Sequence, residues 1–450
     1  MGSGARGVVR WWPVEPEEQP YVVRLWIAGA LLGAGILVAK TASDTLLLSR
    51  TDLGALPRLY LIVALILFVG GWFYRLVADR WPKEDIAWYL PTGAAVLLAV
   101  SWLTVWQRTT NYVAVYCFVE LGNALTVISF WAVLTEKLTS TQGKRLFAVV
   151  GSGITAGAII GGLLVSAIAA LGVADELLLV AAVLFAGEGA VVSRTSLPDV
   201  KTIRPTPPQA AKPASTRILL GDRQVRLLAL LTFALLIGTT LADYQWKRIV
   251  ASAFQEGDLA RFYGALYVPM NVLALSLQGV LASRVIMRFG SVAALGFLPA
   301  GLVLGAAGIL VSPSVAAAII LEASDKLINR TVHNSAMQLQ FVPIESSRRG
   351  QIKALIDGQV RPVAKALGAV LLLALGGWLS GSSLGHTQRL SWLVLALMVG
   401  AGAAVWRLRS AYIATLWRAI DARIGDAAIS GQDPLVRSAL EHYFLHGTPE

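Results

Sequence analysis

Two pairs of polar residues inside apolar segments have the chemistry to bind a solute. Lys40 and Asp44 lie four residues apart, so they share one helix face and can form an ion pair. Glu120 and Asn123 lie about one turn apart on nearly the same face of a later segment. An ionisable group inside a membrane span costs about 2.5 to 3.5 kcal/mol on insertion scales, and such groups usually line a solute or ion pathway. We therefore expect Lys40 to contact an anion, with Asp44 tuning its charge, and we expect Glu120 to line a cavity or to couple to protons or substrate.

Both pairs also have a structural interpretation. Lys40 and Asp44 could neutralise each other near the membrane edge, and Glu120 could hydrogen-bond to a neighbouring helix. Polar residues recur in three later apolar segments, where an interfacial belt of Trp and Lys, bonds between helices, or internal neutralisation are the corresponding alternatives. The binding candidates in those three segments are Asp243, Lys247, Tyr267, Asn271, Asp325 and Arg330.

These candidates stand in a chain with the composition of a membrane protein. Of its 450 residues, 56% are hydrophobic and 14% are charged, against roughly a quarter charged in a typical soluble domain. The apolar residues come in blocks of about 18 to 25, the length that a helix needs to cross about 30 Å of hydrocarbon. The pattern predicts an all-α polytopic membrane protein with twelve transmembrane helices. The blocks span residues 21–48, 58–80, 86–106, 111–136, 145–171, 174–193, 226–246, 262–287, 290–312, 315–341, 360–382 and 390–408.

The twelve blocks fall into two sets of six. The stretch between them holds four prolines among many basic residues, a composition typical of an exposed linker. Two six-helix bundles joined by a linker are the organisation of major-facilitator transporters, whose substrate site lies between the halves near mid-membrane. The predicted regions are a cytoplasmic tail (1–20), an N-terminal six-helix bundle (21–193), the linker (194–225), a C-terminal six-helix bundle (226–408), and an amphipathic interfacial helix with a C-terminal tail (409–450).

The basic residues predict the orientation of the chain. Most of the 38 Lys and Arg fall in the tails, the linker and the loops of one side, which the positive-inside rule assigns to the cytoplasm. We therefore expect a multi-pass protein of the bacterial inner membrane with both termini cytoplasmic. The formal charge of +11 is explained by this topology, so we expect no binding to nucleic acid. The connector-like C-terminal tail leaves room for a further C-terminal domain or a cytoplasmic partner.

Enzyme motifs are missing from the sequence. Cys117 is the only cysteine, which excludes disulfides within the chain and cysteine-based zinc or iron–sulfur sites. No H-E-x-x-H, nucleophile elbow or P-loop occurs, so we expect neither enzymatic activity nor a cofactor or catalytic metal. The run Gly153, Gly157 and Gly161 predicts a close approach of two helices.

Several short motifs follow one another in order along nearly all twelve blocks. Phe130-Trp131 precedes Gly143-Lys144-Arg145-Leu146-Phe147 and the glycine-rich stretch 151–162, and Phe341-Val342-Pro343 precedes the run 350–358 and the stretch 361–368 around Lys365. Lys40 with Asp44, Glu120, and Asp243 to Lys247 stand at matching places. In this collinear set the chain resembles the ATP/ADP antiporter family of plastids and obligate intracellular bacteria, which is related to the major facilitators.

The resemblance implies a twelve-helix carrier that exchanges ATP, ADP or another phosphorylated anion. Lysine side chains suit this substrate because they bind phosphate as point charges. Met337-Gln338 stands where the better-known nucleotide carriers have a Lys-Glu pair, so the expected substrate is a small anion of this broader class, including phosphate. The positions that match charged residues used by the family are Lys40, Glu120, Asp243 and Lys353. Lys365, which lies in the matching stretch 361–368, is a further candidate for substrate binding.

Three functions compete on these observations. The first is a secondary transporter that moves a nucleotide or another phosphorylated or organic anion by alternating access. The second is a proton-coupled exporter of amphipathic compounds, in which Glu120 titrates and the basic residues are structural. The third is a transporter-fold sensor or scaffold without transport, motivated by the amphipathic segment that follows Trp406.

Overall fold

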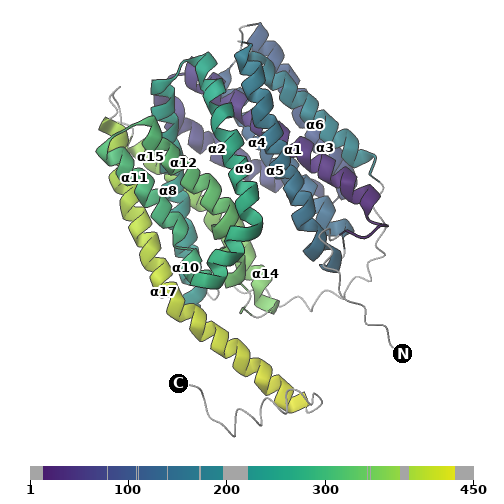
Figure 1. Ribbon diagram of the computed structural model, residues 1–450, viewed down its shortest axis with the longest axis vertical. Coiled ribbons are helices and arrows are strands. Elements are labelled where there is room, and N and C mark those ends of the chain that lie inside the picture. Colours follow the sequence, from purple (N-terminus) through teal and green to yellow (C-terminus); the bar gives the residue numbers. More distant parts are fainter. Residues whose placement is uncertain are drawn as a thin grey trace.

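Each of the twelve apolar blocks coincides with a helix over the residues that the structure describes. The computed structural model describes residues 14–195, 221–375 and 385–430, except 79, 108, 110, 139, 172–173, 342 and 345, and these residues form no strand. The helices of the first half are α1 (Gln19–Arg50), α2 (Leu56–Ala78), α3 (Lys83–Trp106), α4 (Tyr112–Lys137), α5 (Ser140–Ala170) and α6 (Leu177–Ser193). The predicted all-α architecture is confirmed (Figure 1).

The second half repeats the arrangement with more interruptions. Two of its helices contain π-helical stretches, η3 and η4, which are rare and frequently found at functional sites. Its elements are α8 (Arg223–Ala253), α9 (Glu256–Phe289), α10 (Ser291–Ala294), α11 (Phe297–Val311), α12 (Val315–Ala323) running through η3 (Ser324–His333) into α13 (Asn334–Gln340), α14 (Ser346–Leu355) running through η4 (Ile356–Val360) into α15 (Arg361–Ala374), and α17 (Gly385–Ser430).

The helices have the dimensions of membrane spans. Eight of those in the described part of the chain are long and apolar enough to cross a bilayer, and α6 is a shorter apolar helix. Side chains such as Phe68, Trp72 and Phe73 of α2 are exposed, as expected for a surface that meets lipid rather than water. The chain is thus a multi-pass membrane protein.

The largest differences from the predicted helix boundaries are at two places. The eleventh helix begins at Ser346 rather than near residue 360, because the polar stretch that precedes the apolar block is also helical. The last span continues without a break to Ser430, so the amphipathic segment beyond residue 409 extends α17 and does not form a separate helix (Figure 1). The predicted tails before residue 14 and after 430, most of the linker (196–220) and residues 376–384 lie outside the described residues.

Glycines set the packing of the first half. α1 lies against α5 along its length, and an added Cβ at Gly157 would come within 1.8 Å of the Ala30 carbonyl oxygen. At Gly153 and Gly161 the nearest backbone atoms of α1 would be 2.5 and 2.8 Å away. Each of these positions therefore requires glycine, which confirms the close helix approach that the spacing predicts.

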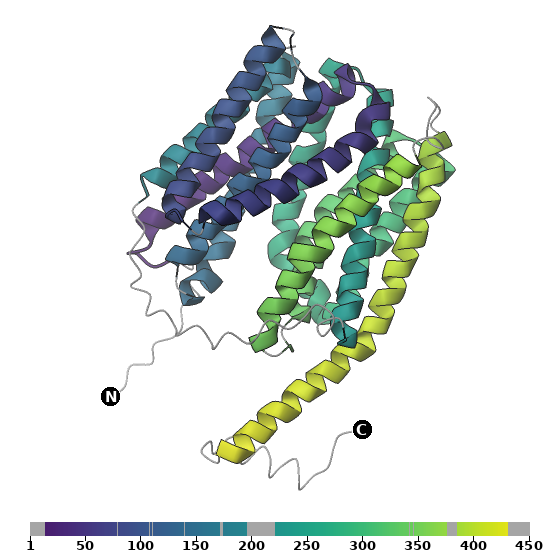
Figure 2. The same cartoon turned by 180° about the vertical axis from the view of Figure 1, so that it is seen from behind.

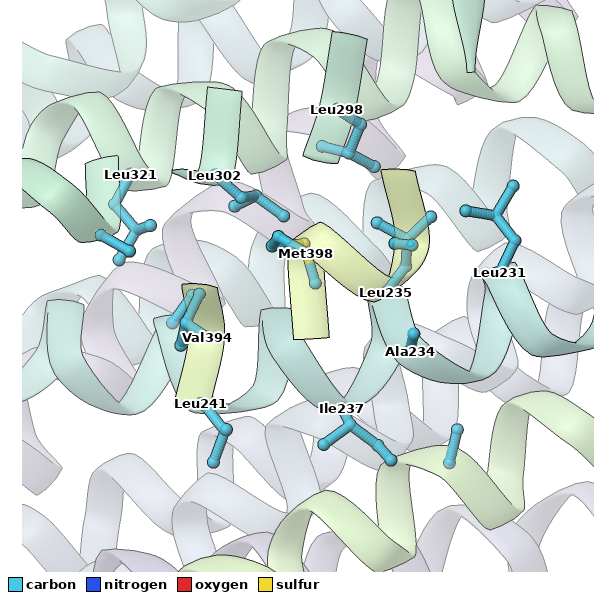
Figure 3. Close-up of a cluster of buried hydrophobic side chains, with 14 of the residues drawn as sticks. Leu231, Ala234, Leu235, Ile237, Leu241, Leu298, Leu302, Leu321, Val394 and Met398 are labelled. Atoms are coloured by element: carbon cyan, nitrogen blue, oxygen red, sulfur yellow. The ribbon is translucent and has the colours of Figure 1, made fainter. Parts of the chain in front are cut away.

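The second half has its own apolar core, built by α8, α11, α12 and α17. Figure 3 shows Leu235, Leu302, Leu321 and Met398 meeting between these helices. All four side chains are buried. Most of this core is formed by residues of the second half.

The two halves meet near one end of the bundle. We call the end where α6 finishes at Ser193 and α8 begins at Arg223 the linker side, and the opposite end the far side. α5 packs on α9, where a Cβ at Gly264 would lie 3.0 Å from the carbonyl oxygen of Gly162; both glycines are within about three turns of the far side. Toward the linker side the ribbons of the halves diverge (Figure 2).

The apolar contacts between the two halves also lie toward the far side. Leu47, Leu56 and Leu59 of the first half belong to the apolar core of the second half, and all three lie in the far-side part of their helices. Among the described residues of the second half, only Ala260 belongs to the core of the first half, and it lies close to the far-side start of α9. The molecule is therefore closed on the far side.

Arg50 ties the halves together at this closed end. Its guanidinium lies 2.9 Å from Asp175, which precedes α6, and its Nε donates to Glu256 of α9 over 3.0 Å. Nearby, Arg261 of α9 donates to the carbonyl oxygens of Ala169 and Ala170 over 3.2 and 3.1 Å. These bonds must break before the far side can open.

Replacing Arg50 by Gln is expected to loosen the far side, because Asp175 and Glu256 then lose their shared cation. Spin labels at Leu171 and Val311, both strongly exposed on that side, report the separation of the halves after Cys117 is replaced by Ser. Pulsed electron resonance should give a longer and broader distance distribution in Arg50→Gln than in Arg58→Gln, which removes another exposed far-side cation. Identical distributions would show that Arg50 does not hold the halves together.

Candidate functional site: a charged cluster between the halves

The centre of the interface holds a network of buried charges. Lys40 of α1 donates to the hydroxyl oxygen of Tyr116 over 2.8 Å and forms an ion pair with Glu120, both on α4. Asp44 lies one turn further along α1, with a carboxylate oxygen 3.5 Å from the Lys40 ammonium. The four-residue spacing of Lys40 and Asp44 thus produces the ion pair that the sequence predicts.

Lys247 of α8 enters the same network from the other half. Its ammonium lies 2.8 Å from Asp243, one turn earlier on α8, and 3.6 Å from Asp44. It also donates to the hydroxyl oxygen of Tyr116 over 2.9 Å. One tyrosine oxygen therefore accepts hydrogen bonds from a lysine of each half.

Tyrosine rings complete the network. Lys247 lies 5.1 Å from the ring centroids of both Tyr60 and Tyr116, within the range of cation–π attraction. The Tyr60 hydroxyl, on α2, donates to Asp243. We call Lys40, Asp44, Tyr60, Tyr116, Glu120, Asp243 and Lys247 the central cluster.

Exposure divides the central cluster into a closed and an open part. The side chains of Lys247 and Asp44 are only 2% and 5% exposed, whereas those of Lys40 and Glu120 are 30% and 23% exposed. Lys40 lies ten residues before the far end of α1 and Glu120 eight residues after the far end of α4, which is about 12 to 15 Å below that end. Lys40 and Glu120 are therefore the part of the central cluster that a solute can reach in this conformation.

A second polar group lies beside the central cluster on α9, α12 and η3. Tyr267 donates to Glu322 over 3.1 Å, and Lys326 lies 3.8 Å from Glu322 and 2.8 Å from Asp325. Tyr263 stacks on Tyr267, and its fully buried hydroxyl has no hydrogen-bond partner among the described residues. We call these five residues the η3 group. Its charges lie close enough to Asp243 to interact with it.

The charges of the two groups do not balance. The central cluster holds two lysines and three carboxylates, and the η3 group adds one lysine and two carboxylates. With all of them ionised, the interface carries excess negative charge in a poorly solvated place. An anion can bind here only if it replaces a carboxylate as the ion-pair partner of a lysine, or if carboxylates take up protons.

Two predicted asparagines lie beside the groups without bonding to them. Asn123 is one turn from Glu120 on α4, and its buried side-chain oxygen has no partner among the described residues. Asn271 is buried and donates to the carbonyl oxygen of Tyr267 on its own helix over 2.7 Å. Neither side chain therefore contacts the lysines in this conformation.

The remaining basic candidates lie outside the central cluster. Arg330 is exposed on η3, and Lys353 is exposed at the linker side, where it donates to Gln338 over 3.2 Å. Lys365 is also exposed, on α15. These three residues are not brought together with Lys40 and Lys247.

Lys365 nevertheless faces inward. Val363, Leu367 and Val370 of α15 are exposed on one face, and their apolar character assigns that face to lipid. At 100° per residue, Lys365 lies on nearly the opposite face, beside the buried Gly368. Lys365 therefore lies on the face of α15 that is turned away from lipid.

Sequence reasoning did not select Tyr60 and Tyr116, the two tyrosines that join the halves. Both lie near the start of their helices, and tyrosine is enriched at the ends of membrane spans, so its presence there carries little information. Tyr116 does lie four residues before Glu120, on the same helix face, and this spacing is a signal that could have included it. Glu322 and Lys326 are likewise four residues apart in the most polar of the predicted spans.

Removing Lys247 is expected to destabilise the protein, because Asp44 and Asp243 lose a buried partner. Breaking a buried ion pair on one side costs about 3 to 5 kcal/mol, so Lys247→Met should lower the temperature of thermal unfolding in detergent clearly. Adding Asp44→Asn should recover part of the loss, since the remaining group is neutral. Lys365→Met, which removes an exposed lysine, is the control. Purely additive losses in the double variant would mean that the two residues do not interact.

The fold is similar to the folds of solved transporters, although the sequence identity is low. A point mutant of the nucleoside transporter NupG matches with a TM-score of 0.62 at 13% identity, over 86% of this chain and 99% of that one. The D-xylose-proton symporter matches with a TM-score of 0.62 at 14% identity, over 86% and 97%. A bacterial homologue of the iron transporter ferroportin in its inward-facing state matches with a TM-score of 0.57 at 14% identity, over 87% and 98%.

Comparisons of sequence find no such match. No family model matches the chain, and no curated protein matches it in sequence. The resemblance to ATP/ADP antiporters therefore stays a prediction from the motifs. The solved structures do show the fold: the chain has the all-α, multi-pass architecture of the major facilitators that its two sets of six apolar blocks predict.

Proposed function

We propose that this protein is a secondary transporter that moves a small phosphorylated anion, such as a nucleotide, across the membrane by alternating access. The observation that carries the proposal is the central cluster, in which Lys40 and Lys247 come from different halves and share both Tyr116 and Asp44. A ligand that bonds to these lysines contacts both halves at once. Binding is thereby connected to the relative position of the halves.

The geometry supports a binding step from the linker side. Lys40 is the more exposed of the two lysines, so it meets an incoming anion first. Phosphate oxygens that replace Glu120 at Lys40 form charge-assisted hydrogen bonds in a site with little water, where such bonds are strong. Lys247 follows when the anion reaches the Tyr116 hydroxyl.

The same step supports a conformational change. Substrate oxygens at Lys40 and Lys247 remove the cations that hold Asp44 in place, and the interface of the halves must rearrange around it. The linker side then closes over the anion, while the contacts of Arg50 on the far side break. A substrate drives this exchange only by binding the closed arrangement more tightly than the open one.

The proposed placement in the membrane follows the positive-inside rule. The linker side, where α6 ends and α8 begins, is proposed to face the cytoplasm of a bacterial cell, so the conformation described here faces inward. The resemblance to ATP/ADP antiporters supports the nucleotide class, and the charge of the lysines supports an anion more generally.

A second candidate is a proton-coupled exporter of cationic or neutral amphipathic compounds. It is favoured by the excess of carboxylates over lysines in the central cluster and the η3 group. In that case the carboxylates bind protons or the cationic substrate, and the lysines only limit the negative charge. Transport would then follow an imposed pH gradient and would not discriminate among anions.

Flux into proteoliposomes tests the two candidates. Vesicles preloaded with ADP or with phosphate should take up labelled ATP or phosphate with saturable kinetics, and Lys40→Met should reduce the uptake at least about tenfold, since it removes a charged contact. Arg58→Met, which removes an exposed cation outside the cluster, should leave the uptake unchanged. If no phosphorylated anion is transported while a lipophilic cation is expelled along a proton gradient, the exporter is the correct function.

A further inference from the structure

A pocket at the linker side, remote from the central cluster, has a composition suited to an anionic lipid. It has a volume of about 490 Å³ and lies between the first turn of α8 and the middle of α17. Its lining combines three cations with an aromatic, an aliphatic and a hydroxyl side chain. The lining residues are Arg223, Trp406, Arg407, Arg409, Ser410 and Ile413.

The pocket lies at the boundary of the membrane. α8 and α17 are antiparallel neighbours: Gln245 donates to Ser391 over 2.9 Å near the far side, and Arg223 donates to Ser410 over 3.4 Å near the linker side. Ser391 and Ser410 are nineteen positions apart, which is about 28 Å along the helix. This is close to the roughly 30 Å thickness of the hydrocarbon, so the pocket is level with lipid headgroups.

The arginines of the pocket have no carboxylate partner among the residues that the structure describes. Among the described residues no carboxylate forms an ion pair with Arg223, Arg407 or Arg409, whereas Arg418, three turns after Arg407 on α17, lies 3.8 Å from Asp222. Three guanidinium groups around one cavity repel each other unless an anion lies between them. Guanidinium groups bind phosphate with two parallel hydrogen bonds, so phosphate fits this site particularly well.

An apolar stripe leads from the membrane interior to the pocket. Trp392, Val399 and Trp406 lie seven residues apart on one face of α17 and are 63%, 65% and 77% exposed. Leu230 of α8, two turns from Arg223, is 53% exposed. The stripe runs through the depth of the hydrocarbon and ends at the arginines, which is the arrangement that acyl chains joined to a phosphate headgroup require.

We infer that this pocket binds the headgroup of an anionic phospholipid, with its acyl chains along Trp392 and Val399. The three arginines bind the phosphate, Trp406 marks the level of the interface, and the Ser410 hydroxyl lies beside them. A free phosphate ion would use the arginines but not the stripe, so the apolar contacts favour the lipid. The lipid joins α8 to α17, and α8 carries Lys247 of the central cluster, yet the inference does not depend on the substrate that is transported.

Thermal unfolding in mixed micelles tests the site without any transport assay. Phosphatidylglycerol should raise the unfolding temperature and phosphatidylcholine should not, because a ligand that binds only the folded protein stabilises it. Arg407→Gln combined with Arg409→Gln should weaken the apparent affinity for phosphatidylglycerol roughly tenfold or more. The matched control is Arg24→Gln combined with Arg226→Gln, which removes two exposed cations of the same side outside the pocket and should behave as the native protein.

Three outcomes would overturn the inference. Equal stabilisation by phosphatidylcholine would mean ordinary lipid contact, and stabilisation by inorganic phosphate alone would mean a site for a soluble anion. An equal loss of affinity in the control pair would mean an effect of total charge. Native mass spectrometry of the unmodified protein, released from micelles of both lipids, gives an independent reading that no variant can compromise: phosphatidylglycerol should remain bound in preference to phosphatidylcholine.

Discussion

The two halves of this protein meet around one buried cation. Lys247 is almost fully enclosed and belongs to the second half, yet two of its partners, Asp44 and Tyr116, belong to the first. A charge removed from water must be paired and hydrogen-bonded, or the cost of its desolvation amounts to several kcal/mol. The contact between the halves is therefore also the means by which Lys247 is neutralised. Anything that changes the partners of Lys247 changes the contact.

This constraint explains how the rest of the fold is arranged. Each half has its own apolar core, and the residues that one half adds to the core of the other lie toward the far side. The far side is closed by Arg50 and by the glycine contact of α5 with α9, whereas Lys40 and Glu120 of the central cluster stay partly exposed. The lipid pocket lies at the end of α8 that is remote from Lys247, where it can hold the helix without taking part in binding.

The sequence predicted the part of the site that obeys a local rule. The pairing of Lys40 with Asp44 follows from four-residue spacing in an apolar helix, and the apolar blocks predicted the all-α fold. Asp243 and Lys247 were candidates, but their ion pair was not predicted. The meeting of α1, α4 and α8 depends on contacts between distant segments, so neither the double role of Tyr116 nor the far-side bonds of Arg50 could be read from spacing. Lys353 entered through a motif alone, and it lies on the linker side, apart from the cluster.

The central claim is that the lysines between the halves bind an anion. Thermal unfolding of the purified protein across nucleotides, phosphorylated sugars and phosphate tests it most directly, because binding to the folded state raises the unfolding temperature. The account predicts a rise with at least one phosphorylated anion that disappears in Lys40→Ala and remains in Arg58→Ala. No rise with any of these anions, or a rise that Lys40→Ala leaves intact, would contradict it.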